Sequence, residues 1–185
     1  ITATSSNPAL IPNPAVNYVS PNSTGSLTYT PVANQSGSAV ITVTVIDAGG
    51  ASTIRTFTVA VNAVNDLPTL DPILDPAAIL EDADLQTVNL SGITAGPGEA
   101  QVLTVTATSS NPALIPNPAV SYVSPSSTGS LTYTPVANQS GSAVVTVTVT
   151  DELGASFSRT FTVSVTPVND SPTLDSIPDP APVLE

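Results

Sequence analysis

Oxygen-bearing side chains dominate the residues of this sequence that could do chemistry. The 185 residues include 14 carboxylates but no His, Cys or Met, and the only basic side chains are Arg55 and Arg159. Oxygen-rich clusters without nitrogen or sulfur ligands suit a hard cation such as Ca²⁺, which takes 6 to 8 oxygens. All but three carboxylates gather in or just after two Pro-containing linkers: Asp66, Asp71, Asp75, Glu81, Asp82, Asp84, Glu99, Asp170, Asp175, Asp179 and Glu185. The sequence therefore predicts calcium at the linkers, with turn capping and a soluble surface as the alternative role of these side chains.

The same composition argues against several function classes. Without His, Cys or Lys, the usual general bases, thiol nucleophiles and Schiff-base formers are missing, so we expect no enzyme. A net charge of −12 makes nucleic acid and anionic membranes unsuitable partners. No apolar run approaches the roughly 18 residues of a membrane span, so membrane insertion is not expected.

A long internal repeat organises the chain. The segment TATSSNPALIPNPAV occurs at Thr2 to Val16 and again, letter for letter, at Thr106 to Val120, which is an offset of 104 residues. Such repeats mainly contact their neighbours in sequence, so an array can change length easily. Near-identical neighbouring copies favour a spacer over a specialised recognition site.

Each repeat has the pattern of an all-β fold. Apolar and polar residues alternate strictly over 41–45 and over 145–149, which predicts strands with Val and Ile facing the core and Thr facing water. Turn signals such as Asn13-Pro14 and Gly49-Gly50 interrupt the chain every 8 to 12 residues or so. Short strands at this spacing predict a β-sandwich.

The linkers set the expected domain boundaries. Pro68 and Pro172 follow Val-Asn-Asp at 64–66 and 168–170 and should hold the connections extended and stiff. We therefore expect a partial sandwich at 1–66 without its first strands, a complete sandwich at 67–170, and the first strand of a following repeat at 171–185. The N-terminus begins within a β pattern, so we also expect the sequence to be part of a longer polypeptide.

Several motifs carry a resemblance. The spacing from Asp47 or Asp151 through a strand pair to Val-Asn-Asp-x-Pro resembles bacterial cadherin-like and immunoglobulin-like repeats of large extracellular adhesins. The resemblance implies tandem sandwiches with calcium held between them, Asp151 joining the linker before its repeat and Glu81 the linker after it. The metal ligands it implies are Asp47, Asn65, Asp66, Glu81, Asp151, Asn169, Asp170 and Glu185.

The sequence departs from this cadherin-like pattern at two acidic motifs. Neutral Asn34-Gln35 and Asn138-Gln139 stand where the family has Asp-x-Glu, and 96–99 keeps one carboxylate of an Asp-x-Asp motif. With fewer charges, any calcium site should be weak, in the millimolar class of extracellular modules.

These observations predict a secreted or cell-surface structural protein that forms a stalk or a head-to-tail fibre, as part of a large adhesin. Its partners would be neighbouring repeats or copies of itself. The alternative is an adhesive module that itself binds carbohydrate or another cell-surface ligand, with the tyrosines as stacking platforms; in the other interpretation the tyrosines plug the core. Without first strands, residues 1–66 should expose Ile41, Val43, Phe57 and Val59 or their neighbours.

Overall fold

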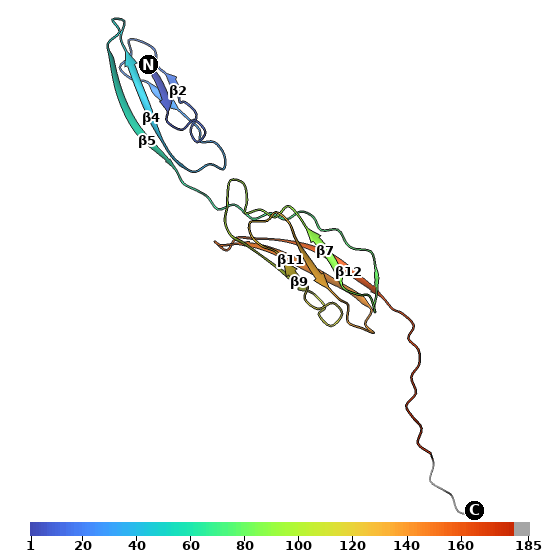
Figure 1. The fold of residues 1–185 in the computed structure, drawn as a ribbon. Coiled ribbons are helices and arrows are strands. Elements are labelled where there is room, and N and C mark those ends of the chain that lie inside the picture. The colour runs from blue at the N-terminus through green and yellow to red at the C-terminus, as the bar shows by residue number, and fades with distance from the viewer. Residues whose placement is uncertain (180–185) are drawn as a thin grey trace, which may run out of the picture.

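The computed structural model describes residues 1–179, and they form strands and turns without a helix, so none of them belongs to a helix that could cross a membrane. We call residues 1–66 unit 1 and residues 67–170 unit 2. Figure 1 shows the two units end to end, with the chain leaving unit 2 at the end far from unit 1. Unit 1 contains β1 (Thr2–Ser5), β2 (Ala15–Asn17), β3 (Ser26–Thr28), β4 (Gly37–Ile46) and β5 (Ser52–Val61). Unit 2 contains β6 (Ile79–Leu80), β7 (Gln86–Leu90), β8 (Leu103–Ser109), β9 (Ala119–Ser121), β10 (Gly129–Tyr133), β11 (Gly141–Asp151) and β12 (Ser156–Thr166).

Unit 2 is a sandwich of two sheets. One sheet has the order β6-β12-β11-β8 and the other the order β7-β10-β9. All pairs are antiparallel except β6 and β12, where Ile79 lies beside Val165 in a parallel pair. The long hairpin β11-β12 is the centre of the first sheet, and its strict alternation explains why it forms. Val145, Val147 and Val149 are fully buried, whereas Thr146 and Thr148 between them are half-buried.

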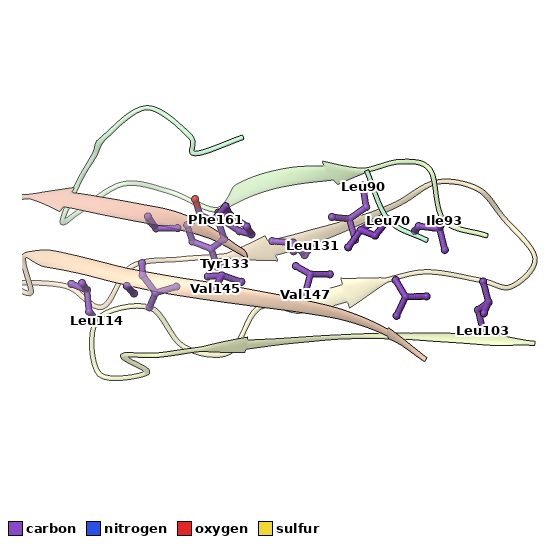
Figure 2. Close-up of a cluster of buried hydrophobic side chains, with 14 of the residues drawn as sticks. Leu70, Leu90, Ile93, Leu103, Leu114, Leu131, Tyr133, Val145, Val147 and Phe161 are labelled. Atoms are coloured by element: carbon purple, nitrogen blue, oxygen red, sulfur yellow. The ribbon is translucent and has the colours of Figure 1, made fainter. Parts of the chain in front are cut away.

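The core of unit 2 lies between these sheets (Figure 2). It is built from aliphatic side chains with Phe161 and Tyr133 among them, and the predicted inward-facing valines are part of it. The expectation of an all-β sandwich with a core built mainly of small aliphatic side chains is therefore confirmed.

An irregular segment at the start of unit 2 covers one side of this core. Thr69 forms a single antiparallel bridge with Thr94, and Leu70 is buried. Arg159 on β12 donates from Nε to the Leu70 carbonyl at 3.2 Å. Further along, an Asp75 carboxylate oxygen accepts the backbone N–H of Thr162 at 2.6 Å. This segment is thus tied to β12 by side chains more than by a strand ladder.

Unit 1 repeats only part of this architecture. Its described sheets are β1-β4-β5 and β2-β3, and β5 pairs with β4 alone. Phe57 is 39% exposed and Val45 46%, as expected for a unit without first strands. Val43 and Val59 are half-buried, and the expectation for Ile41 was wrong. Ile41 is fully buried, because it packs with Ala3, Leu10, Ile11 and Ala39 in a small cluster of its own.

The described part of the C-terminal segment, residues 171–179, carries no strand. Leu174 is 85% exposed, although its repeat counterpart Leu70 is 2% exposed. The proposed first strand of a following repeat therefore stays a prediction, and its last residues, with Glu185, lie outside the described part of the chain.

Candidate functional site

The candidate metal ligands Asp47 and Asp151 occupy equivalent hairpin turns. In unit 1, one Asp47 carboxylate oxygen, Oδ1, accepts the backbone N–H groups of Gly49 and Ala51, both at 2.9 Å. In unit 2, Asp151 Oδ1 accepts those of Leu153 at 2.9 Å and Ala155 at 2.8 Å. Each Asp therefore closes its own hairpin, which is the turn-capping role considered for these side chains.

Asp151 differs from Asp47 in its second carboxylate oxygen. Asn65 in the linker donates from its side-chain amide to Asp151 Oδ2 at 2.9 Å. Asp151 is only 5% exposed, whereas Asp47 is exposed. Burial acts to raise the pKa of Asp151, but the hydrogen bonds from Asn65 and from the backbone of Ala155, Leu153 and Gly154 outweigh it, so the pKa lies below its ordinary value. The carboxylate is therefore held in its charged form at neutral pH.

A second contact ties the linker to unit 2. The backbone N–H of Asp66 donates to Glu99 Oε1 at 2.9 Å. Gln101 donates from its side-chain amide to Asn65 Oδ1 and, at 3.3 Å, to Glu99 Oε2. The other amide atom of Gln101, Oε1, is buried and has no hydrogen-bond partner among the described residues.

Two glycines let this loop approach the linker and unit 1. A Cβ atom at Gly96 would stand 2.8 Å from Asp66 Cβ, and one at Gly98 would stand within van der Waals overlap of the Asn34 carbonyl of unit 1. Both glycines have φ values, +122° and +77°, that side chains disfavour. A groove at this joint is lined by 31–36 and 61–64 from the unit 1 side and by Asp66 and 97–99. Asn34 and the 96–99 loop lack the acidic motifs of the cadherin-like pattern. At this joint the backbone of the loop lies against the backbone carbonyl of Asn34.

The other predicted ligands lie at the far end of unit 2. Glu81, 5% exposed, accepts the backbone N–H of Val168 at its Oε1, at 2.8 Å. Asn169 and Asp170, the next residues, are exposed, and the Asn169 amide donates only to the Asp170 carbonyl, at 3.4 Å, among the described contacts. Glu81 thus holds the chain where it leaves β12, and Glu185 lies outside the described residues.

The donor set at the joint does not fit a calcium ion as it is arranged. The four carboxylate oxygens of Asp151 and Glu99 all accept N–H groups of the protein. The Asn65 amide turns its N–H donors, and not its oxygen, toward Asp151. Within residues 1–179, no three acidic side chains form a group that could hold a metal ion. Calcium at the linkers stays a prediction, and the arrangement itself is a hydrogen-bonded contact between linker and unit.

Sequence reasoning missed the parts played by Glu99 and Gln101. Glu99 was visible as a carboxylate in a Gly-Pro-Gly loop, but no spacing connected it with a backbone N–H of Asp66. Gln101 carried no signal at all, because a neutral amide before a strand is common. The link between Asp151 and Asn65 was suggested only by the resemblance to cadherin-like repeats.

The fold and this joint define a class of protein, the tandem immunoglobulin-like β-sandwich. A family model for the bacterial Ig domain matches residues 2–60 and 65–166, and the chain belongs to this family. A comparison with curated proteins finds no match.

Several solved structures resemble the chain at low identity. Domains 4 and 5 of the S-layer protein SbsC are 20% identical, with a TM-score of 0.39, over 89% of this chain and 69% of that one. A second SbsC structure is 19% identical, with a TM-score of 0.41, over 94% of this chain, which spans only 21% of that protein. The protein SGBP-B of a Bacteroides ovatus mixed-linkage glucan utilization locus, in complex with a heptasaccharide, is 16% identical, with a TM-score of 0.21, over 89% of this chain and 37% of that one. The fold assignment rests on the family and not on these similarities.

Proposed function

We propose that this chain is a structural segment of an extracellular stalk or surface fibre, built from bacterial Ig domains joined end to end within a large adhesin. The observation that carries the proposal is the path of the chain through unit 2. The linker enters unit 2 at one end, and the chain leaves at the opposite end, so each added unit lengthens the molecule (Figure 1). The departing residues 171–175 also repeat the residues 67–71 that begin unit 2 at all but one position.

The surface chemistry supports a mechanical role outside the cell. A net charge of −12 keeps neighbouring stalks apart and soluble, and the chain contains no Cys whose oxidation could change with compartment. The buried carboxylates Asp151 and Glu81 accept N–H groups in structural contacts, which supports the proposal that the protein is not an enzyme.

No specific observation favours the alternative, a carbohydrate-binding module. In unit 2, Tyr133 is 4% exposed and belongs to the core, and Tyr122 packs against it. Tyr29 is 42% exposed beside Phe57 in unit 1, but its repeat counterpart is the buried Tyr133. A completed unit is therefore expected to offer no stacking platform at this position.

Length measurements test the stalk proposal. Chains with two, four and eight copies of residues 67–170 should show a maximum dimension in small-angle X-ray scattering that grows by about 35 to 45 Å per copy, the length of strands of ten or eleven residues. A maximum dimension that grows much more slowly would mean that the units fold back on one another, and the stalk proposal would be wrong. Labelling intact cells that make the protein with an antibody to unit 2 tests its location.

A further inference from the structure

The Val-Asn-Asp linker occurs twice, at 64–66 and at 168–170. One copy shows the hydrogen bond of the Val, and the other copy shows those of the Asn and the Asp. At the end of unit 2, the backbone N–H of Val168 bonds to Glu81, which belongs to the unit that the chain is leaving. At the joint, the side chain of Asn65 bonds to Asp151 and the backbone N–H of Asp66 bonds to Glu99, and both acceptors belong to the unit that the chain is entering.

We propose that Val-Asn-Asp is a hydrogen-bonded clamp that fixes successive units relative to each other without a metal ion. Its Asn and Asp are held by the unit ahead, as Asn65 and Asp66 are, and behind a complete unit its Val is held as well, as Val168 is by Glu81. The residues that the sequence predicted as calcium ligands then act as hydrogen-bonding partners. At the joint between unit 1 and unit 2 the clamp consists of the Asn65 and Asp66 contacts, because residues 1–66 contain no counterpart of Glu81 to hold Val64. The clamp does not depend on whether the protein is a surface stalk.

The chain geometry leaves little freedom at the joint. β5 ends at Val61 and the first anchored residue is Asn65, so only residues 62–64 separate the sheet of unit 1 from unit 2. The four Cα–Cα steps from Val61 to Asn65 span at most about 14 Å when extended. The close approach of Gly98 to the Asn34 carbonyl adds a contact between the two units beside this short bridge.

Hydrogen bonds offset the charge of two carboxylates at the joint. Three carboxylates lie at the joint: each oxygen of Asp151 and Glu99 already accepts at least one N–H group, whereas the Asp66 carboxylate accepts none among the described contacts. Hydrogen bonds from N–H groups stabilise a carboxylate, as a cation would.

The clamp also predicts which surface would bind the second copy of the linker. Asn169 and Asp170 repeat Asn65 and Asp66, and both are exposed. The clamp predicts that they would bind the end of a repeat that carries an Asp151-type hairpin and a Glu99-type loop. At the far end of unit 1, the exposed Asp47 hairpin uses only Oδ1 among the described contacts, so its Oδ2 could accept a linker Asn as Asp151 Oδ2 does.

Spin-label distance measurements test the clamp. Because the chain has no Cys, Ser38→Cys in unit 1 and Ser164→Cys in unit 2, both exposed, place one label on each unit. We expect one narrow distance distribution that is the same with a chelator and with millimolar calcium chloride. The variant Asn65→Ala should broaden it and raise the undocked population by about tenfold or more, since a hydrogen bond to a charged group is worth at least that factor.

The repeat supplies the controls. Asn169→Ala removes the same residue from the exposed linker copy and should leave the distribution unchanged. Gly98→Ala should broaden it by overlap with Asn34, whereas Gly50→Ala, with a similar φ and no neighbour within 4 Å, should not. A wild-type distribution that is broad in chelator and narrows with calcium would overturn the proposal. So would a distribution that neither Asn65→Ala nor Gly98→Ala changes.

Discussion

Unit 1 and unit 2 place the same residues in different surroundings. Val149 is fully buried in unit 2, whereas its counterpart Val45 is 46% exposed in unit 1. Phe161 and Phe57 differ in the same way, at 2% and 39% exposure, and so do Tyr133 and Tyr29, at 4% and 42%. The strands and hairpins of the two units nevertheless agree, including the full β4-β5 and β11-β12 ladders.

The difference shows which part of a unit forms strands and which part closes the core. Alternation and turn residues are sufficient for the hairpins, because both units have them. Closure depends on residues 67–104, which supply Leu70, Leu90 and Ile93 to the core of unit 2 and have no counterpart within residues 1–66. The two long hairpins therefore form without the segment that closes the core.

Truncating the paired phenylalanines should give the largest difference between the units. Phe161→Ala should destabilise unit 2 by about 3 to 5 kcal/mol, because it removes a fully enclosed aromatic ring. Phe57→Ala should cost unit 1 less than half as much, since its ring is already partly in water. Hydrogen exchange followed by mass spectrometry during a denaturant titration measures each unit separately. Equal costs in the two units would contradict the comparison.

Completing unit 1 should remove the difference. Fusing a copy of residues 67–104 ahead of Ile1 should stabilise unit 1 by at least about 3 kcal/mol, because several half-exposed apolar side chains become buried. The same exchange measurement should show slower exchange over β4 and β5. A fused segment of the same composition in scrambled order is the control, and an equal gain from it would show that burial in the native register is not the cause.

The contact between Asp75 and Thr162 should have a smaller effect. Asp75→Ala should destabilise unit 2 by about 2 kcal/mol, since it removes a charged acceptor from a backbone N–H on β12. Asp179 holds the same position in the repeat within the exposed C-terminal segment, so Asp179→Ala should change nothing measurable. Chemical unfolding monitored by tyrosine fluorescence compares the two variants. A loss of stability from both would mean that the effect comes from general charge and not from this contact.

The smallest effect concerns pH. Because the folded-state pKa of Asp151 is below its ordinary value, its contribution to stability is present above about pH 4 and is lost as the pH falls through the lowered pKa. In that window the bond from Asn65 should weaken. The carboxyl carbon shift of Asp151 and the amide shifts of Asn65, measured from pH 6 to pH 2, should change together. The variant Asn65→Ala should move the Asp151 midpoint upward, and an unmoved midpoint would show that Asn65 does not stabilise the carboxylate.

The sequence predicted the fold better than it predicted the joint. The alternation around Val145 and Val147 indicates which side chains are buried, because side-chain direction in a strand follows position alone. The alternation predicts that Ile41 faces the core, but its full burial without the first strands was not foreseen, because it depends on Leu10 and Ile11 folding back over the sheet after a turn. The roles of Glu99 and Gln101 depend on how a loop of one unit meets a linker 33 or more residues earlier, and no local pattern encodes that meeting.

Residual dipolar couplings test the central claim most directly, which is that the Val-Asn-Asp linker joins the two units rigidly without a metal ion. Amide couplings would be measured for unit 1 and unit 2 in one weakly aligned sample of the whole chain that contains a chelator. We predict that both units report the same alignment tensor in magnitude and orientation, and that added calcium chloride leaves it unchanged. Tensors that differ between the units in chelator and converge only when calcium is added would contradict the claim.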